Sequence, residues 1–238
     1  MATRLRRWTM RVALGTGVVA VLLTGAAVYW VVLRDDTPEA AALVERKVVT
    51  TERAADGGLD GGWTVVPGDD VWAGYRITER VSGLDNVAVA RTGEVDASLT
   101  IAGAEVTEVT AEVDMTTLES QDTELPGVGG RDKAMRGEGL ETDLYRTATF
   151  TLTEPIDLGG LPEPGTEVTA EAVGVLELHG VERPVTIPVA ARWSGEVIDL
   201  TGSVDIDLAD HDIDPPSPKV VSVAATGTIE LQLTFGRE

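Results

Sequence analysis

The chain has 238 residues, with 40 Asp and Glu against 19 Lys and Arg, a formal net charge of −21, and no cysteine. A chain this acidic is poorly suited to neutralising phosphates, so we expect no nucleic-acid partner. Without cysteine it forms neither a disulfide nor a lipoprotein anchor, and its core must be large enough to hold the fold unaided.

Residues 1–33 contain no acid, and four arginines precede the uncharged stretch 12–33. That stretch is long enough to cross a bilayer, and positive charge stays in the cytoplasm. We therefore expect a basic cytoplasmic tail (1–11), a single-pass signal anchor (12–33) in a bacterial cytoplasmic membrane, and an extracytoplasmic remainder. A cleavable signal peptide is the alternative, since Thr24–Ala27 offers small residues, although its apolar region is usually about 7–15 residues long.

Residues 34–62 combine acids with glycine pairs, as in Asp56-Gly57-Gly58 and Asp60-Gly61-Gly62. This composition predicts a flexible tether, within which Pro38 is compatible with the first turn of a short helix over 38–47. The folded domain is expected to occupy residues 63–238.

From about Glu94 onward, apolar and polar residues alternate in one run after another, as in Val95–Ile101 and Ile229–Phe235. A period of two is typical of strands with one buried face. Further runs of this kind predict an all-β, antiparallel, closed barrel; they cover 109–115, 150–153, 168–178, 185–193 and 198–208.

The alternation stops between Glu119 and Asp143, where five glycines, one proline and several charges occur. A connection this long usually has a function or contains its own helix. Two interpretations stay open, namely a crossover helix near 131–136 that closes one end of the barrel, and a lid that contacts a ligand.

Several segments in sequence order resemble the YceI-like family of exported, polyisoprenoid-binding proteins. They are Trp63–Pro67 with Val71–Ile77, Gly93–Thr100, Val113–Leu118, Arg131-Asp132 with Asp143–Phe150, Gly174–Val185 with its His179-Gly180 turn, and Asp212–Pro216 with Gly227–Leu231. The chain departs from the family in two places: Arg146 stands where proline usually follows the tyrosine, and Ala134 stands where many members have histidine.

The resemblance implies a lipocalin-like, eight-stranded barrel with an apolar tunnel for an isoprenoid tail, and eight strands leave room for one ligand. Alternation independently indicates which side chains point inward. We expect the lining to include Ile101, Val113, Phe150, Leu176, Leu178, Ile187, Val204, Ile206 and Leu231. A solid core without a cavity is the alternative, but only 5 Trp, 3 Tyr and 2 Phe are available to fill it.

A head group at the barrel mouth would need hydrogen-bond donors, and Arg131, Lys133 and Arg136 are candidates because they cluster in the irregular segment. The ordinary alternative is surface ion pairing with the interleaved Asp132 and Glu138. The expected partner is an isoprenoid lipid, either a polyprenyl phosphate or an isoprenoid quinone, held without chemical change. A homodimer is left open.

Neither a catalytic site nor a metal site is expected. There is no Gly-x-Ser-x-Gly motif, and the two histidines, His179 and His211, cannot form a zinc site without cysteine. The acidic run 205–214 lacks the glycine and glutamate positions of a calcium loop. We therefore predict no catalytic residue, no metal and no cofactor. Two other functions stay open: an enzyme on a calycin-type barrel acting on a hydrophobic small molecule, and a structural or stress-related envelope protein with a solid core.

Overall fold

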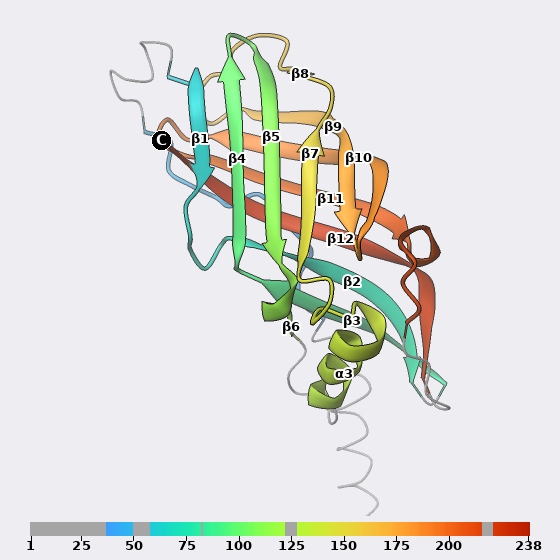
Figure 1. Ribbon diagram of the computed structural model, residues 1–238. Coiled ribbons are helices and arrows are strands. Elements are labelled where there is room, and N and C mark those ends of the chain that lie inside the picture. Colours follow the sequence, from blue (N-terminus) through green and yellow to red (C-terminus); the bar gives the residue numbers. More distant parts are fainter. Residues whose placement is uncertain (1–36, 50–57, 82, 122–127, 216–220) are drawn as a thin grey trace, which may run out of the picture. The chain divides into compact units, whose positions relative to one another are not determined.

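A computed structural model of the chain describes residues 37–49, 58–81, 83–121, 128–215 and 221–238 (Figure 1). Eight antiparallel strands form a closed ring in the order β1-β4-β5-β7-β9-β10-β11-β12, and β1 pairs again with β12. Their bounds are β1 Gly61–Val65, β4 Val95–Ala102, β5 Glu105–Asp114, β7 Thr147–Leu152, β9 Glu167–Leu178, β10 Val181–Trp193, β11 Ile198–Asp207 and β12 Val221–Arg237. The predicted all-β, eight-stranded antiparallel barrel is confirmed.

Four further strands extend this ring: β2 (Trp72–Val81), β3 (Leu84–Thr92), β6 (Glu119–Ser120) and β8 (Ile156–Asp157). β2 and β1 follow one another along the same edge of β12, with β2 pairing to 221–232 and β1 to 235–237. The sheet then continues from β2 through β3 to β6, while β8 pairs with β5.

The alternation of apolar and polar residues along each strand explains why the inside of the barrel is apolar. In β4, Ala97, Leu99 and Ile101 are buried, whereas the residues between them face outward. Every second side chain of a strand points to the same face, so the sequence pattern places one apolar surface inside the ring. The turn between β9 and β10 has only two residues, His179 (φ 55°) and Gly180 (φ 72°), as a tight hairpin with two positive φ values requires.

Short helices close one end of the barrel. The 3₁₀ turn η1 (Met115–Thr117) is capped by Asp114, whose carboxylate accepts from the Thr116 amide and hydroxyl; these two bonds lower the pKa of Asp114. The helix α3 (Val128–Ala134) runs directly into the π-helical turn η2 (Met135–Gly139), and η3 (Leu208–His211) follows β11. The helix expected in the irregular segment is thus present.

The buried residues form two apolar clusters, one toward each end of the barrel. Trp63, Trp193 and Phe235 belong to the cluster around β1. The other cluster contains Met115, Leu118 and Leu140 from the helical end, together with Leu176, Leu178 and Leu208. No disulfide is available, and these two clusters supply the apolar burial that holds the fold.

The described part of the predicted tether differs from a free linker. Residues 37–49, which we call the N-terminal strap, contain no helix but are hydrogen-bonded to the barrel wall, for instance from the Val49 amide to the Ser194 carbonyl (2.8 Å). Leu59 is 3% exposed, and β1 starts at Gly61, so the domain begins before residue 63. These segments pack against the barrel because apolar and hydrogen-bonding residues lie between their acids and glycines.

The predicted tail and anchor, residues 1–33, lie outside the described residues. Within the ranges that the structure describes, no helix has the length and apolar character needed to span a membrane.

Candidate functional site: an apolar cavity along the barrel

A cavity of about 260 Å³ lies inside the barrel. Residues of both apolar clusters line it, from Leu59 and Trp193 at one end to Met135 and Leu208 at the other. The cavity therefore extends along the barrel from one end to the other and is not confined to one end. Its volume is close to the lower limit of about 300 Å³ that is usual for small-molecule sites.

The cavity wall is almost entirely hydrocarbon. Alanine, valine, leucine and isoleucine dominate it, and its few side chains that carry an N–H or O–H group are those of Tyr75, Thr149, Thr166, Trp193 and Thr228. Among the described residues that line it there is no Asp, Glu, His, Lys or Arg. Such a wall favours an apolar chain and offers no countercharge to a buried charged group.

The structure places eight of the nine predicted lining residues on the cavity wall: Ile101, Val113, Phe150, Leu176, Leu178, Ile187, Ile206 and Leu231. Val204 shares the inward face of β11 with Ile206 but is not part of the wall. Whether any of them binds a ligand stays a prediction. The cavity itself differs from the solid core that was left open as an alternative.

Sequence reasoning missed the parts of the wall that are not strands. Met135 and Leu140 come from the helical segment, Pro162 and Thr166 from the β8–β9 loop, and Leu59 from the predicted tether. None of these positions belongs to an alternating run, so the period-two signal could not identify them. The apolar character of Leu59, Met135 and Leu140 among charged neighbours is the signal that was available.

The three predicted head-group residues do not line the cavity. Lys133 is exposed on α3, and Arg136 of η2 donates from Nη2 to the Leu118 carbonyl (3.2 Å). Arg136 thereby joins η2 to the end of η1. The side chain of Arg131 lies outside the described residues. A role of these residues toward a ligand stays a prediction.

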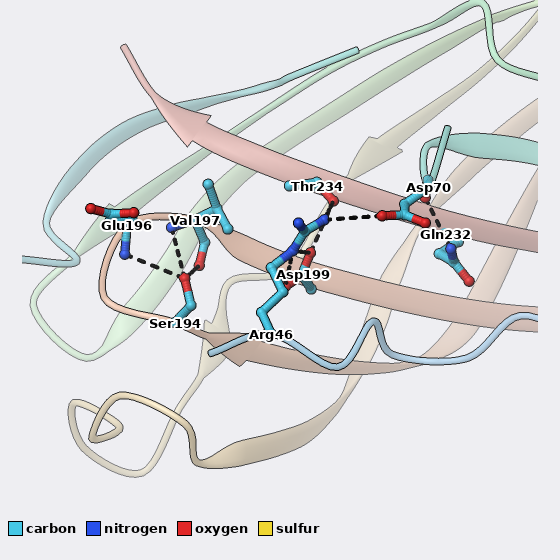
Figure 2. A network of polar contacts seen from close by, with 8 residues as sticks. All are labelled: Arg46, Asp70, Ser194, Glu196, Val197, Asp199, Gln232 and Thr234. Carbon is cyan, nitrogen blue, oxygen red and sulfur yellow. Dashed lines mark hydrogen bonds and ion pairs between the residues drawn. The ribbon is translucent and has the colours of Figure 1, made fainter. Parts of the chain in front are cut away.

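On the outside of the barrel, the strap is held by a buried carboxylate (Figure 2). Arg46 donates from Nε to both oxygens of Asp199 (2.8 and 2.9 Å) and from Nη2 to the Thr234 hydroxyl (3.1 Å). Thr234 in turn donates to Asp199 (2.9 Å), directly across the β11–β12 pair. The side chain of Asp199 is 3% exposed, so Arg46 supplies the countercharge that this buried group requires.

The strap also covers arginines of β2 and β3. Arg76 donates to the Pro38 carbonyl (2.8 Å) and pairs with Glu230 (3.2 Å), while Arg91 donates to the Glu39 carbonyl. Burial lowers the pKa of Arg91, Glu230 opposes that change, and Arg76 adds to it. The strap therefore crosses the outer face from β3 to the β10–β11 turn.

Both histidines lie at the helical end of the barrel and make structural contacts. His179 Nδ1 is 3.1 Å from the His211 carbonyl, and its Nε2 is 3.1 Å from Glu141 Oε2. The ring of Tyr145 packs against His179 at 4.0 Å between centroids. No group of three or more potential metal ligands occurs in the part of the chain that the structure describes.

Comparison with known proteins gives a family and a fold. Residues 73–235 match the sequence profile of the YceI-like domain. A polyisoprenoid binding domain from Saccharophagus degradans, implicated in plant cell wall breakdown, is 17% identical with a TM-score of 0.55, over 75% of this chain and 99% of that chain. No curated protein matches the chain.

Two further solved structures are less similar. Burkholderia cenocepacia BcnA is 16% identical with a TM-score of 0.49, over 67% of this chain and 95% of that chain. A Campylobacter jejuni YceI protein is 13% identical with a TM-score of 0.42, over 61% of this chain and 83% of that chain. At these identities, the likeness to solved structures concerns the fold alone.

Proposed function

Because the chain belongs to the YceI-like domain family, we propose that its barrel binds the apolar tail of an isoprenoid lipid and holds it without chemical change. The observation that carries this proposal is the cavity wall, which is hydrocarbon from one apolar cluster to the other. The similarity to a domain described as polyisoprenoid binding supports the same ligand class.

We propose binding without catalysis because of the residue types that line the cavity. Aliphatic side chains and threonine hydroxyls can enclose a tail, but they include no acid–base pair of the kind that hydrolysis or isomerisation uses. The proposed role is accordingly storage or carriage of the lipid.

We further propose that the barrel is extracytoplasmic and held at the membrane by residues 12–33, whose uncharged stretch follows four arginines. A carrier beside the bilayer can exchange its lipid with the membrane over a short path. Intact mass spectrometry of the protein purified from bacterial membranes tests the anchor, because a cleaved signal peptide would leave a chain that lacks the first residues.

Extraction of lipid from the purified full-length protein, followed by mass spectrometry, tests the binding function. We expect an isoprenoid compound in near-stoichiometric amount. A protein that co-purifies with no lipid, and that takes up no added isoprenoid, would contradict the proposal.

A matched pair of variants on β9 ties the bound lipid to the cavity. Ala172 is 6% exposed and lines the cavity, whereas Thr169 faces outward on the same strand. Ala172→Phe fills the space and should lose most of the bound lipid, while Thr169→Phe adds the same ring outside and should retain it. Equal lipid content in the two variants would place the lipid elsewhere.

A further inference from the structure

The barrel wall contains one seam between neighbouring strands. β10 and β11 pair only from Val189–Gly202 to Trp193–Ile198. Beyond that point, residues 181–188 of β10 stay paired with β9, and residues 203–207 of β11 stay paired with β12. Among the described residues no pairing joins these two stretches, which we call the β10–β11 seam.

The sequence of β10 keeps the seam unpaired. Pro184 and Pro188 have no N–H, so each must sit at a position whose nitrogen faces away from β9, that is, toward β11. Two of the four donors that β10 could offer to β11 along the seam are thereby removed. The two prolines of β10 therefore disfavour hydrogen bonding to β11 along the seam.

The cavity extends to the seam. Ile187 on the β10 side and Ile206 on the β11 side both line it. At its far end the seam is bounded by η3, where His211 Nδ1 lies 3.3 Å from the Val181 carbonyl. An opening at this place would lead from the outside directly to the hydrocarbon wall.

Arg183 stands at this seam with its side chain on the inner face. It lies directly opposite Leu176 of β9, and residues opposite one another in an antiparallel pair share a face. Leu176 is buried in the cavity wall, whereas Arg183 is exposed, so its long side chain extends from the inner face of β10 to solvent.

The guanidinium of Arg183 is available to a ligand. It donates to the carbonyl of its neighbour Glu182 (3.1 Å), and no described carboxylate pairs with it. Arg46, Arg76 and Arg192, by contrast, each pair with a carboxylate. Arg183 therefore combines a guanidinium that has no described carboxylate partner with a position directly opposite the cavity-lining Leu176.

We propose that the β10–β11 seam is the access route of the lipid and that Arg183 binds an anionic, phosphate-bearing head group there, while the tail occupies the cavity. This inference rests on the proposed function and names the head-group class for the same site. A guanidinium matches phosphate geometry through two parallel hydrogen bonds. This proposal places the head group at Arg183 of β10, whereas the sequence alone suggested Arg131, Lys133 and Arg136 in the α3–η2 segment.

The test is a competition between two lipids with the same tail. Full-length protein in non-ionic detergent is mixed with equal amounts of geranylgeranyl phosphate and geranylgeraniol, and native mass spectrometry gives the ratio of the two bound forms. We expect Arg183→Gln to lower the phosphate-to-alcohol ratio about tenfold, which corresponds to about 1.4 kcal/mol. The comparison variant Lys133→Gln tests the rival head-group site on α3, and it leaves the ratio unchanged if the head group lies at Arg183.

The outcomes separate the two proposals. If the wild type binds the lipids and Arg183→Gln leaves the ratio as it was, or Lys133→Gln lowers it instead, the inference is wrong and the proposed function stands. If the wild type binds neither lipid, the proposed function itself fails. Retained binding of the alcohol by Arg183→Gln shows that the variant is folded.

Discussion

Two separate factors disfavour any side chain at Gly180, namely its positive φ and the nearby ring of Tyr145. Its φ is 72°, and a Cβ there would lie 2.8 Å from the Tyr145 ring, whereas Gly159 has a similar φ of 69° and open space around it. Gly159→Ala therefore measures backbone strain alone, which we expect to cost about 1 kcal/mol. Gly180→Ala should cost about 1–3 kcal/mol more, because the ring must move. Urea unfolding followed by tryptophan fluorescence measures both, and equal costs would show that the Tyr145 contact is unimportant.

The Arg46–Asp199 pair is asymmetric, and its two partners should respond differently to removal. Arg46→Ala leaves a carboxylate that is 3% exposed without its countercharge, whereas Asp199→Ala leaves a guanidinium that is 34% exposed and can turn to water. We expect Arg46→Ala to lower the free energy of unfolding by about 2–3 kcal/mol and Asp199→Ala to lower it by less. The double variant should be more stable than Arg46→Ala. A double variant whose loss equals the sum of the single losses would mean that the two groups are not coupled.

At the scale of elements, the seam predicts a contrast in amide hydrogen exchange within one strand. Thr186 has the same strand parity as Pro184 and Pro188, so its N–H faces the seam, whereas the equivalent N–H of Ala190 faces paired Thr201. We expect the Thr186 amide to exchange quickly and the Ala190 amide slowly in the native protein. Similar protection at the two sites would mean that β11 or another segment covers the seam.

Periodicity predicts the elements of the wall because one physical rule, alternation across a half-buried strand, governs each of them. Leu176, Leu178 and Ile206 could be placed on the inner face in this way. The same rule places Val204 on the inner face of β11 beside Ile206, but a face does not by itself specify contact with the cavity, and Val204 is not part of the wall.

The strap and the ends of the cavity were not predicted, for a different reason. Arg46 and Asp199 are 153 residues apart, and no local pattern pairs one arginine with one of many acids. Met135 and Leu140 line the cavity from a helical segment that alternation does not describe. These features depend on tertiary contacts, which neither spacing nor composition specifies.

At the scale of the whole molecule, the net charge of −21 predicts a dependence of stability on salt. Repulsion among many carboxylates opposes compaction, and ions screen it over about 10 Å at 0.1 M salt. We therefore expect the Tm of the full-length protein to rise between low salt and 0.5 M NaCl. A Tm that falls would show that attractive pairs, such as Arg46–Asp199, outweigh the repulsion.

The pairing of β1 with β12 has a consequence for biosynthesis. Trp63 and Val65 find their partners at Arg237 and Phe235, so almost the entire barrel sequence is translated between the two strands that close the ring. Until β12 emerges, the nascent chain presents unpaired edges at β1 and at β11, and such edges readily pair with other chains. The ring therefore cannot close progressively from the N-terminus, and the unfinished barrel is open to such pairing until β12 is complete.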